Sequence, residues 1–198
     1  MKHGPLAWSG ATGAALLMLP PLRAWLESSM TLHMLVQGPL LVLCGVLLTG
    51  GLSAQVRARL DGWNACGITG LVATAVAFAL FMIPRLLDLA VADLRVDAAK
   101  ALALAASGIA LRLSWRRAGA MVQGFFLGNM LPMTGAVGQM YQDSPLRLCN
   151  AYLLGDQVLL GQLLVALAVA AGVVWFALLA RALVRREHEA GLAVIGKP

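Results

Sequence analysis

Long apolar runs recur along this chain, and short polar stretches separate them. A helix needs roughly 20 apolar residues to cross the hydrocarbon core of a bilayer. Helices satisfy their backbone hydrogen bonds internally where water is absent, so runs of this length predict transmembrane helices. The predicted helices cover residues 5–21, 30–52, 64–83, 98–113, 120–141 and 158–180.

The composition leads to the same fold class. Charged residues make up only 12% of the chain and hydrophobic residues 60%, whereas soluble domains carry about 25% charged residues. So few charges cannot cover a water-facing surface. We therefore expect an all-α integral membrane protein, a polytopic bundle of about six transmembrane helices. Residues 1–198 then form a single transmembrane domain, with no room for a sizeable soluble domain beside it.

The first predicted helix, residues 5–21, also resembles a secretory signal. Lys2 and His3 precede its apolar stretch, as the charged head of a signal peptide would. No clear cleavage site between small residues follows this stretch. We therefore expect a retained helix.

The net charge of +6 raises the question of a nucleic-acid partner. However, the basic residues stand at the ends of apolar segments and form no stripe with interleaved aromatic residues. With the N-terminus in the cytoplasm, ten of the 15 Lys and Arg residues lie inside. The positive-inside rule therefore predicts both termini in the cytoplasm of a multi-pass protein of the bacterial inner (plasma) membrane. The basic residues expected outside are Arg23, Arg85, Arg95, Lys100 and Arg147.

The stretch from Met30 to Gln37 contains the residues best suited to bind a metal. Met30, His33, Met34 and Gln37 occupy positions i, i+3, i+4 and i+7, which share one helical face. Thioether and imidazole ligands together suit copper, and methionine favours the cuprous ion. We predict a copper site at the outer membrane face made by His33, Met30 and Met34 with Cys149. The alternative is a methionine-rich packing face with His33 hydrogen-bonded near the headgroups.

The cysteines show no spacing typical of a metal site or of a disulfide framework. There are three, Cys44, Cys66 and Cys149, and no CxxC motif. Cys44 and Cys66 fall in apolar runs, where a thiol behaves as a small hydrophobic group.

Other polar positions have both structural and functional interpretations. In the fifth predicted helix, Asn129 precedes Pro132 and either satisfies the kink or bonds to another helix, and Met130 and Met133 are further candidate ligands. Asp156 at the start of the sixth helix is expected to cap it. Lys100 is expected to extend to water at the edge of the membrane.

Catalytic motifs do not occur in the sequence. It contains no HExxH, GxSxG or P-loop pattern. His33 is the only histidine near a predicted helix, so a bis-histidine haem within the chain is excluded. We do not expect an enzyme, and copper is the only cofactor that the residues suggest.

The order of three motifs resembles the CtaG-like family of cytochrome c oxidase assembly factors. His33-Met34 is followed by residues 39–45 (PLLVLCG), then by residues 83–90 (IPRLLDLA), and finally by Asp156-Gln157 before residues 160–161 (LG). Gly38 stands where the family generally has a further histidine. The chain is thus similar to a divergent member in which several family histidines are missing.

The resemblance implies an inner-membrane biogenesis factor that assists assembly or copper loading of a respiratory or copper oxidase. It would act at the outer membrane face, with membrane lipid and oxidase subunits as its partners. Two alternatives remain open. One is a non-catalytic accessory subunit of a larger respiratory membrane complex, and the other is a small transporter.

Overall fold

The computed structural model describes residues 5–195 and the side chains of residues 5–185. The described residues form helices and contain no β-strand, so the all-α prediction is confirmed. The elements are α1 (Pro5–Leu17), α2 (Pro20–Leu26), α3 (Met30–Leu32), η1 (His33–Gln37), α4 (Gly38–Leu48), η2 (Thr49–Gly51), α5 (Ala54–Trp63), α6 (Ile68–Phe81), α7 (Pro84–Ala92), α8 (Leu94–Trp115), α9 (Ala120–Asp143) and α10 (Leu154–Ile195).

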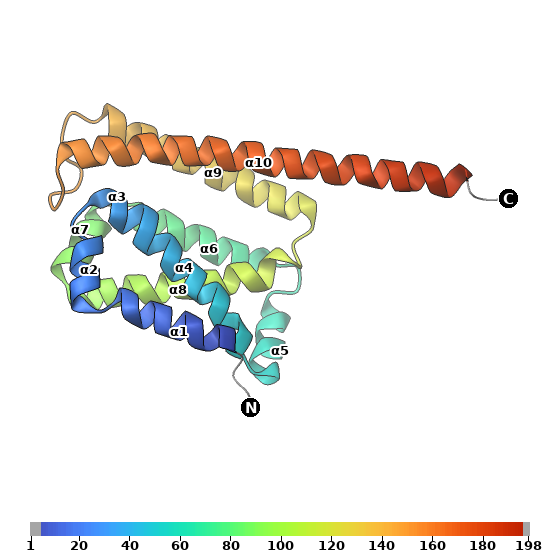
Figure 1. The fold of residues 1–198 in the computed structure, drawn as a ribbon, viewed down its shortest axis with the longest axis horizontal. Helices are drawn as coiled ribbons and strands as arrows, with labels where there is room; N and C mark the ends of the chain where they lie inside the picture. Colours follow the sequence, from blue (N-terminus) through green and yellow to red (C-terminus); the bar gives the residue numbers. More distant parts are fainter. Residues whose placement is uncertain (1–4, 196–198) are drawn as a thin grey trace.

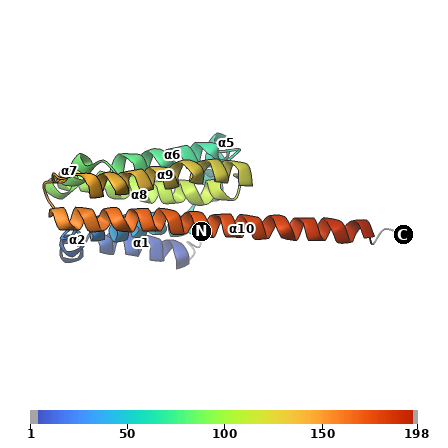
Figure 2. The same ribbon diagram turned by 90° about the horizontal axis from the view of Figure 1, so that it is seen from above.

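The long helices run in alternating directions along one common axis (Figure 1). α1 packs on α4, α4 on α8, and α8 on α6. α9 and α10 form a hairpin beside this group, which they contact mainly through α3 and α6. Figure 2 shows the same helices from above, with α10 extending well past the others. At 42 residues, α10 is about 63 Å long.

Each predicted segment overlaps one of the long helices α1, α4, α6, α8, α9 and α10, and short helices lie between them. Prolines begin two of the short helices, Pro20 in α2 and Pro84 in α7, because the first helical position needs no backbone donor. α7 is amphipathic and buries Leu87 and Ala90 against the bundle.

Among the described residues, two helices are long and apolar enough to cross a membrane, Met30–Gly51 and Leu154–Arg185. A third span is added if α5 and α6, which meet at 87°, are counted as one broken span. This is fewer than the six spans expected. α1 has only 13 residues, and α8 and α9 contain charged or polar side chains within their length.

The closest helix contacts are made at glycines. A Cβ atom added to Gly45 of α4 would overlap the backbone carbonyl of Ala105 in α8. One added to Gly108 of α8 would likewise overlap the backbone carbonyl of Val42 in α4. Gly138 of α9 and Gly161 of α10 face each other in the same way. Small residues thus let these backbones approach closely, as helices in lipid require.

Gly124 and Gly128 of α9 have the GxxxG spacing that is typical of close helix contacts, but Gly128 makes no such contact. A Cβ atom added to Gly124 would lie 3.1 Å from the ring of Trp175, but nothing lies within 4 Å of one added to Gly128 or to Gly135. These two glycines border a hollow between α9 and α10. The tight contact of the hairpin is made at Gly138 instead.

Gly45→Ala is expected to destabilise the fold by about 1–3 kcal/mol, because the added methyl group must displace backbone rather than a flexible side chain. Thermal unfolding of the purified protein in detergent measures this effect. Gly128→Ala is the matched control, since it adds the same group to open space. Equal melting temperatures for the two variants would contradict the packing described here.

Candidate functional site

A π-helical turn opens the second long helix and directs two polar side chains into the bundle. Residues His33–Gln37 form this turn, and the N–H of Gly38 bonds back five residues to the carbonyl of His33. Pro39 has no N–H to donate, so the regular ladder cannot continue through it. Such turns often occur at functional sites. Here the turn buries His33 and Gln37 fully against α8.

Lys100 of α8 is the centre of the polar contacts. Its ammonium Nζ lies 2.5 Å from His33 Nε2, 2.9 Å from Gln37 Oε1 and 2.7 Å from Asp97 Oδ1. These contacts use all three of its protons. Lys100 is only 2% exposed, so the expectation that it extends to water is wrong.

The Asp97 carboxylate is fully buried and joins two cations. Its Oδ1 pairs with Lys100, and its Oδ2 lies 2.9 Å from Arg23 Nε of α2. The same nitrogen of Arg23 also donates to Glu27 Oε1 at 2.9 Å. Two cations therefore face two anions, and the cluster is neutral overall. This balance matters because an unpaired buried charge costs several kcal/mol.

His33 has no free ring nitrogen in this arrangement. Its Nδ1 lies 2.6 Å from the hydroxyl of Tyr152, in the loop between α9 and α10. An ammonium can only donate, so Nε2 accepts from Lys100 and Nδ1 carries the proton that is donated to Tyr152. Asp88 of α7 holds this loop by accepting from the backbone N–H of Asn150 at 2.8 Å and of Ala151 at 3.1 Å. We call the set Arg23, Glu27, His33, Gln37, Asp97, Lys100 and Tyr152 the polar cluster.

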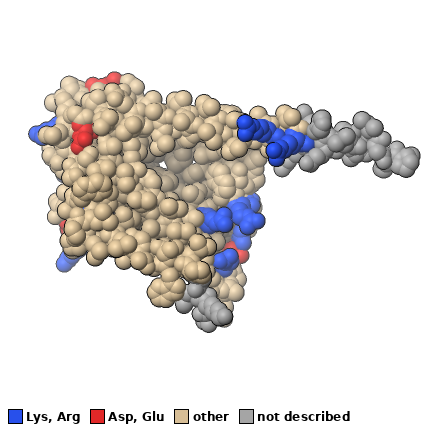
Figure 3. All heavy atoms as spheres, viewed as in Figure 1, with Lys and Arg blue, Asp and Glu red and all other residues tan. Residues whose placement is uncertain are grey.

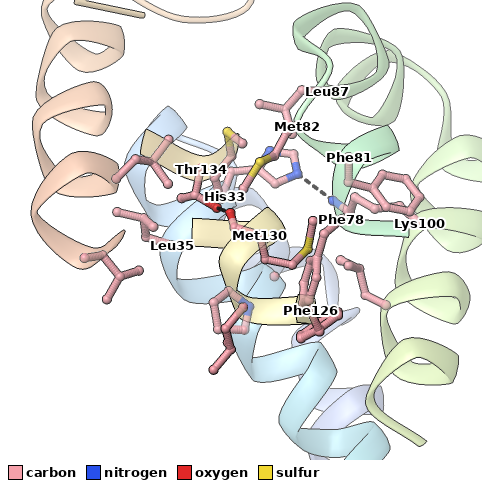
Figure 4. Close-up of a pocket in the computed structure, with 17 residues that line it drawn as sticks. His33, Leu35, Phe78, Phe81, Met82, Leu87, Lys100, Phe126, Met130 and Thr134 are labelled. Carbon is pink, nitrogen blue, oxygen red and sulfur yellow. Dashed lines mark hydrogen bonds between the residues drawn. The ribbon is translucent and has the colours of Figure 1, made fainter. Parts of the chain in front are cut away.

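A cavity of about 320 Å³ adjoins the polar cluster and lies between the α9–α10 hairpin and the other helices. His33 and Lys100 form its polar wall, and the rest of its lining is almost entirely apolar. Three methionines from different helices face it, namely Met34, Met82 and Met130. Figure 4 shows His33, Met82, Met130 and Lys100 around this space, together with Phe78, Phe81 and Phe126.

The structure separates the four predicted copper ligands into two groups. His33 and Met34 line the cavity. Met30 and Cys149 lie in a neighbouring apolar cluster that also contains Tyr152, and Met34 packs against this cluster as well as lining the cavity. The Cys149 thiol donates to the carbonyl of Pro84 at 3.4 Å, and burial raises its pKa to about 12, with the Asp88 carboxylate adding to the effect. A thiol must ionise to bind a metal well, so these surroundings disfavour Cys149 as a ligand.

His33 also lies close to two carboxylates that could act as metal ligands, Glu27 and Asp97. Donor atoms of Glu27, His33 and Asp97 all lie within 4.8 Å of one another, which is close enough to hold one metal ion. His33 therefore lies near two sets of possible ligands, these carboxylates and the methionines of the cavity. The ammonium of Lys100 contacts both His33 and Asp97.

Other polar residues have structural roles. The Asn129 amide donates to the Phe125 carbonyl one turn earlier in α9. This hydrogen bond therefore lies within its own helix rather than between helices. Asp156 lies in the first turn of α10, but its carboxylate accepts from Ser29 Oγ at 3.1 Å and from Met30 N at 3.3 Å. It caps the start of α3 rather than of its own helix, which corrects the sequence interpretation.

Sequence reasoning missed Met82 and the burial of Asp97 and Lys100. The i, i+3 spacing of this ion pair within an apolar helix was the available signal. Comparisons with protein-family models, with curated proteins and with solved structures give no match to this chain. What the site can do therefore follows from its own geometry and chemistry.

Asp97→Asn is expected to destabilise the protein by about 3–5 kcal/mol, because it leaves Arg23 and Lys100 buried with one counter-ion between them. Thermal unfolding in detergent measures the loss. Asp143→Asn is the control, since that carboxylate is exposed at the end of α9, where it accepts a hydrogen bond from the Gln139 amide at 2.9 Å. Near-equal stability of the two variants would show that the polar cluster does not hold the fold together.

Proposed function

We propose that this chain is a multi-pass inner-membrane protein that assists assembly or copper loading of a respiratory or copper oxidase. It acts through His33 and the methionines of the cavity. The observation that carries the proposal is that one buried imidazole and three methionines from separate segments of the chain line a single apolar cavity. The chain itself carries out no catalytic reaction.

The distribution of side chains supports lipid as the surrounding medium. Large apolar residues are exposed along the outside, among them Val72 at 55%, Leu102 at 72% and Val173 at 63%. Charged and polar residues such as Asp97 and Lys100 are buried inside. This pattern is the reverse of a water-soluble protein, in which such ionisable groups are almost never fully buried.

The alternating directions of α1, α4, α6, α8, α9 and α10 support six crossings (Figure 1). α1 is short, and α8 buries Asp97 and Lys100 inside the bundle, while its exposed cations Arg95 and Arg112 lie near its two ends. Figure 3 shows Lys and Arg side chains at the end of the bundle near α5 and along α10 beyond it. By the positive-inside rule this end is cytoplasmic, and the polar cluster is at the outer face.

The surroundings of His33 suit a cuprous ion. Imidazole and thioether groups are soft or borderline ligands and select copper(I) over hard cations. The ion would bind on the cavity side of the polar cluster, where Met34, Met82 and Met130 are available. An apolar cavity near the outer face is also a reasonable place to hold copper before its transfer to a client.

The three segments that resemble the CtaG-like family lie at one end of the bundle. Tyr152 and Asp156, around the start of α10, contact His33 and Met30 of the second long helix. Leu87, in the IPRLLDLA segment, lines the same cavity as His33. Their convergence at one site supports the expectation that these motifs work together.

His33→Ala and the double variant Met82→Leu/Met130→Leu are each expected to weaken copper(I) binding at least tenfold. The measurement is competition with a cuprous chelator, under reducing and oxygen-free conditions, on purified protein in detergent. Met121→Leu is the control, because Met121 is on the same helix as Met130 but is 88% exposed. Wild-type affinity in the His33 variant would contradict the copper site.

A permanent accessory subunit is the second candidate, and the hollow along α9 favours it. Gly124, Gly128 and Gly135 border this hollow opposite Val169 and Gly172 of α10. Helices in membranes pack closely at such small residues. A transmembrane helix of a larger complex would fit against this face.

Gly128→Ile distinguishes the two candidates, because it places a large side chain in the hollow at a residue that does not line the copper site. An accessory subunit co-purifies with its complex in equal amounts from native membranes, and the substitution is expected to abolish this association. An assembly factor is recovered mostly without its client, and its association is unchanged by the substitution. Quantitative mass spectrometry of the purified material decides between these results.

A further inference from the structure

We propose that Lys100 is an internal cation that occupies the metal-binding position at His33 and thereby sets the metal affinity of the site. A metal ion reaches His33 Nε2 only when the ammonium moves away from it. This inference rests on the proposed copper function and concerns the regulation of that same site.

The geometry around Lys100 is that of a cation held by three ligands. Nζ has one nitrogen and two oxygens around it, from His33, Gln37 and Asp97, at 2.5, 2.9 and 2.7 Å. The other ring nitrogen of His33 is engaged by Tyr152. Nε2 therefore carries the only lone pair that His33 can offer to a metal, and this lone pair points at the ammonium (Figure 4).

The charge balance explains why the ammonium competes with a metal. With Lys100 in place the polar cluster is neutral, because Arg23 and Lys100 balance Glu27 and Asp97. Any metal ion added beside it creates a net buried charge, which low-polarity surroundings penalise. The penalty is larger for a divalent ion than for a monovalent one. Lys100 thus weakens all metal binding at His33 and disfavours divalent ions most.

The position of Lys100 allows the ammonium to withdraw. Its side chain also lines the cavity, and lysine has a long, flexible stem. A small rotation takes Nζ away from Nε2 while Asp97, on the same helix, stays within reach. Filling of the cavity by copper on the methionine side is the event that favours this movement.

Removal of the ammonium tests the inference directly. Lys100→Met is expected to bind copper(I) at least tenfold more tightly than the wild type, because the remaining cluster has one excess negative charge and a free Nε2. Arg95→Met is the matched control, since it removes an exposed cation from the same helix. The probe is copper(I) alone, measured by chelator competition on the purified protein in detergent.

If Lys100→Met fails to fold, the double variant Asp97→Asn/Lys100→Met replaces it. This variant removes one anion and one cation, so the polar cluster stays neutral. It also frees Nε2, and it too is expected to bind more tightly than the wild type. Adding His33→Ala to either variant is expected to remove the gain. A merely structural role for Lys100 would change the melting temperature without this His33-dependent gain.

The possible results separate this inference from the proposed function. Unchanged or weaker binding by both Lys100 variants, with normal His33-dependent binding by the wild type, overturns the role of Lys100 alone. No binding by the wild type but His33-dependent binding by Lys100→Met supports the role of Lys100 and contradicts copper handling by the natural chain. No binding by any of these proteins overturns both.

Discussion

The rest of this structure depends on the ion pairs that the buried carboxylate of Asp97 makes. It pairs with Arg23 of α2 on one side and with Lys100 of α8 on the other. Through Lys100 it also fixes His33 and Gln37 in the π-helical turn, and through His33 it fixes the Tyr152 loop. Four separate segments therefore meet at one neutral cluster. In a low-dielectric interior such a cluster is stable only when every charge has its partner.

Two kinds of contact hold different parts of the bundle together, close helix packing at glycines and the polar cluster. Glycine contacts join α4 to α8 along their middle, and a second set joins α9 to α10. The polar cluster then closes the end of the bundle where α2 and α7 lie. Since the helix exteriors are apolar, contact with lipid costs them little, and the bundle can leave a cavity between its two groups of helices. This cavity is the space through which a ligand can approach His33.

His33 belongs to both parts of the molecule, which links stability to function. Its two nitrogens complete the polar cluster, while its ring forms a wall of the methionine-lined cavity. A metal ion can use this imidazole only by exchanging with a contact that also holds the fold together. A site of this kind trades binding strength for a closed resting state, which suits the transient copper binding proposed above.

The sequence by itself determined the helical class, the positions of the long helices, and the candidacy of His33 and Met34. Hydropathy and helical spacing are local properties, and the backbone must form helices wherever long apolar runs meet lipid. Only the tertiary structure decided that Lys100 is buried rather than extended to water, that Met82 joins the cavity, and that Cys149 packs elsewhere. His33 meets partners 67 and 119 residues away, and Gly138 rather than Gly128 meets α10. Such pairings depend on how separate helices rotate and pack against one another, which no local pattern of residues specifies.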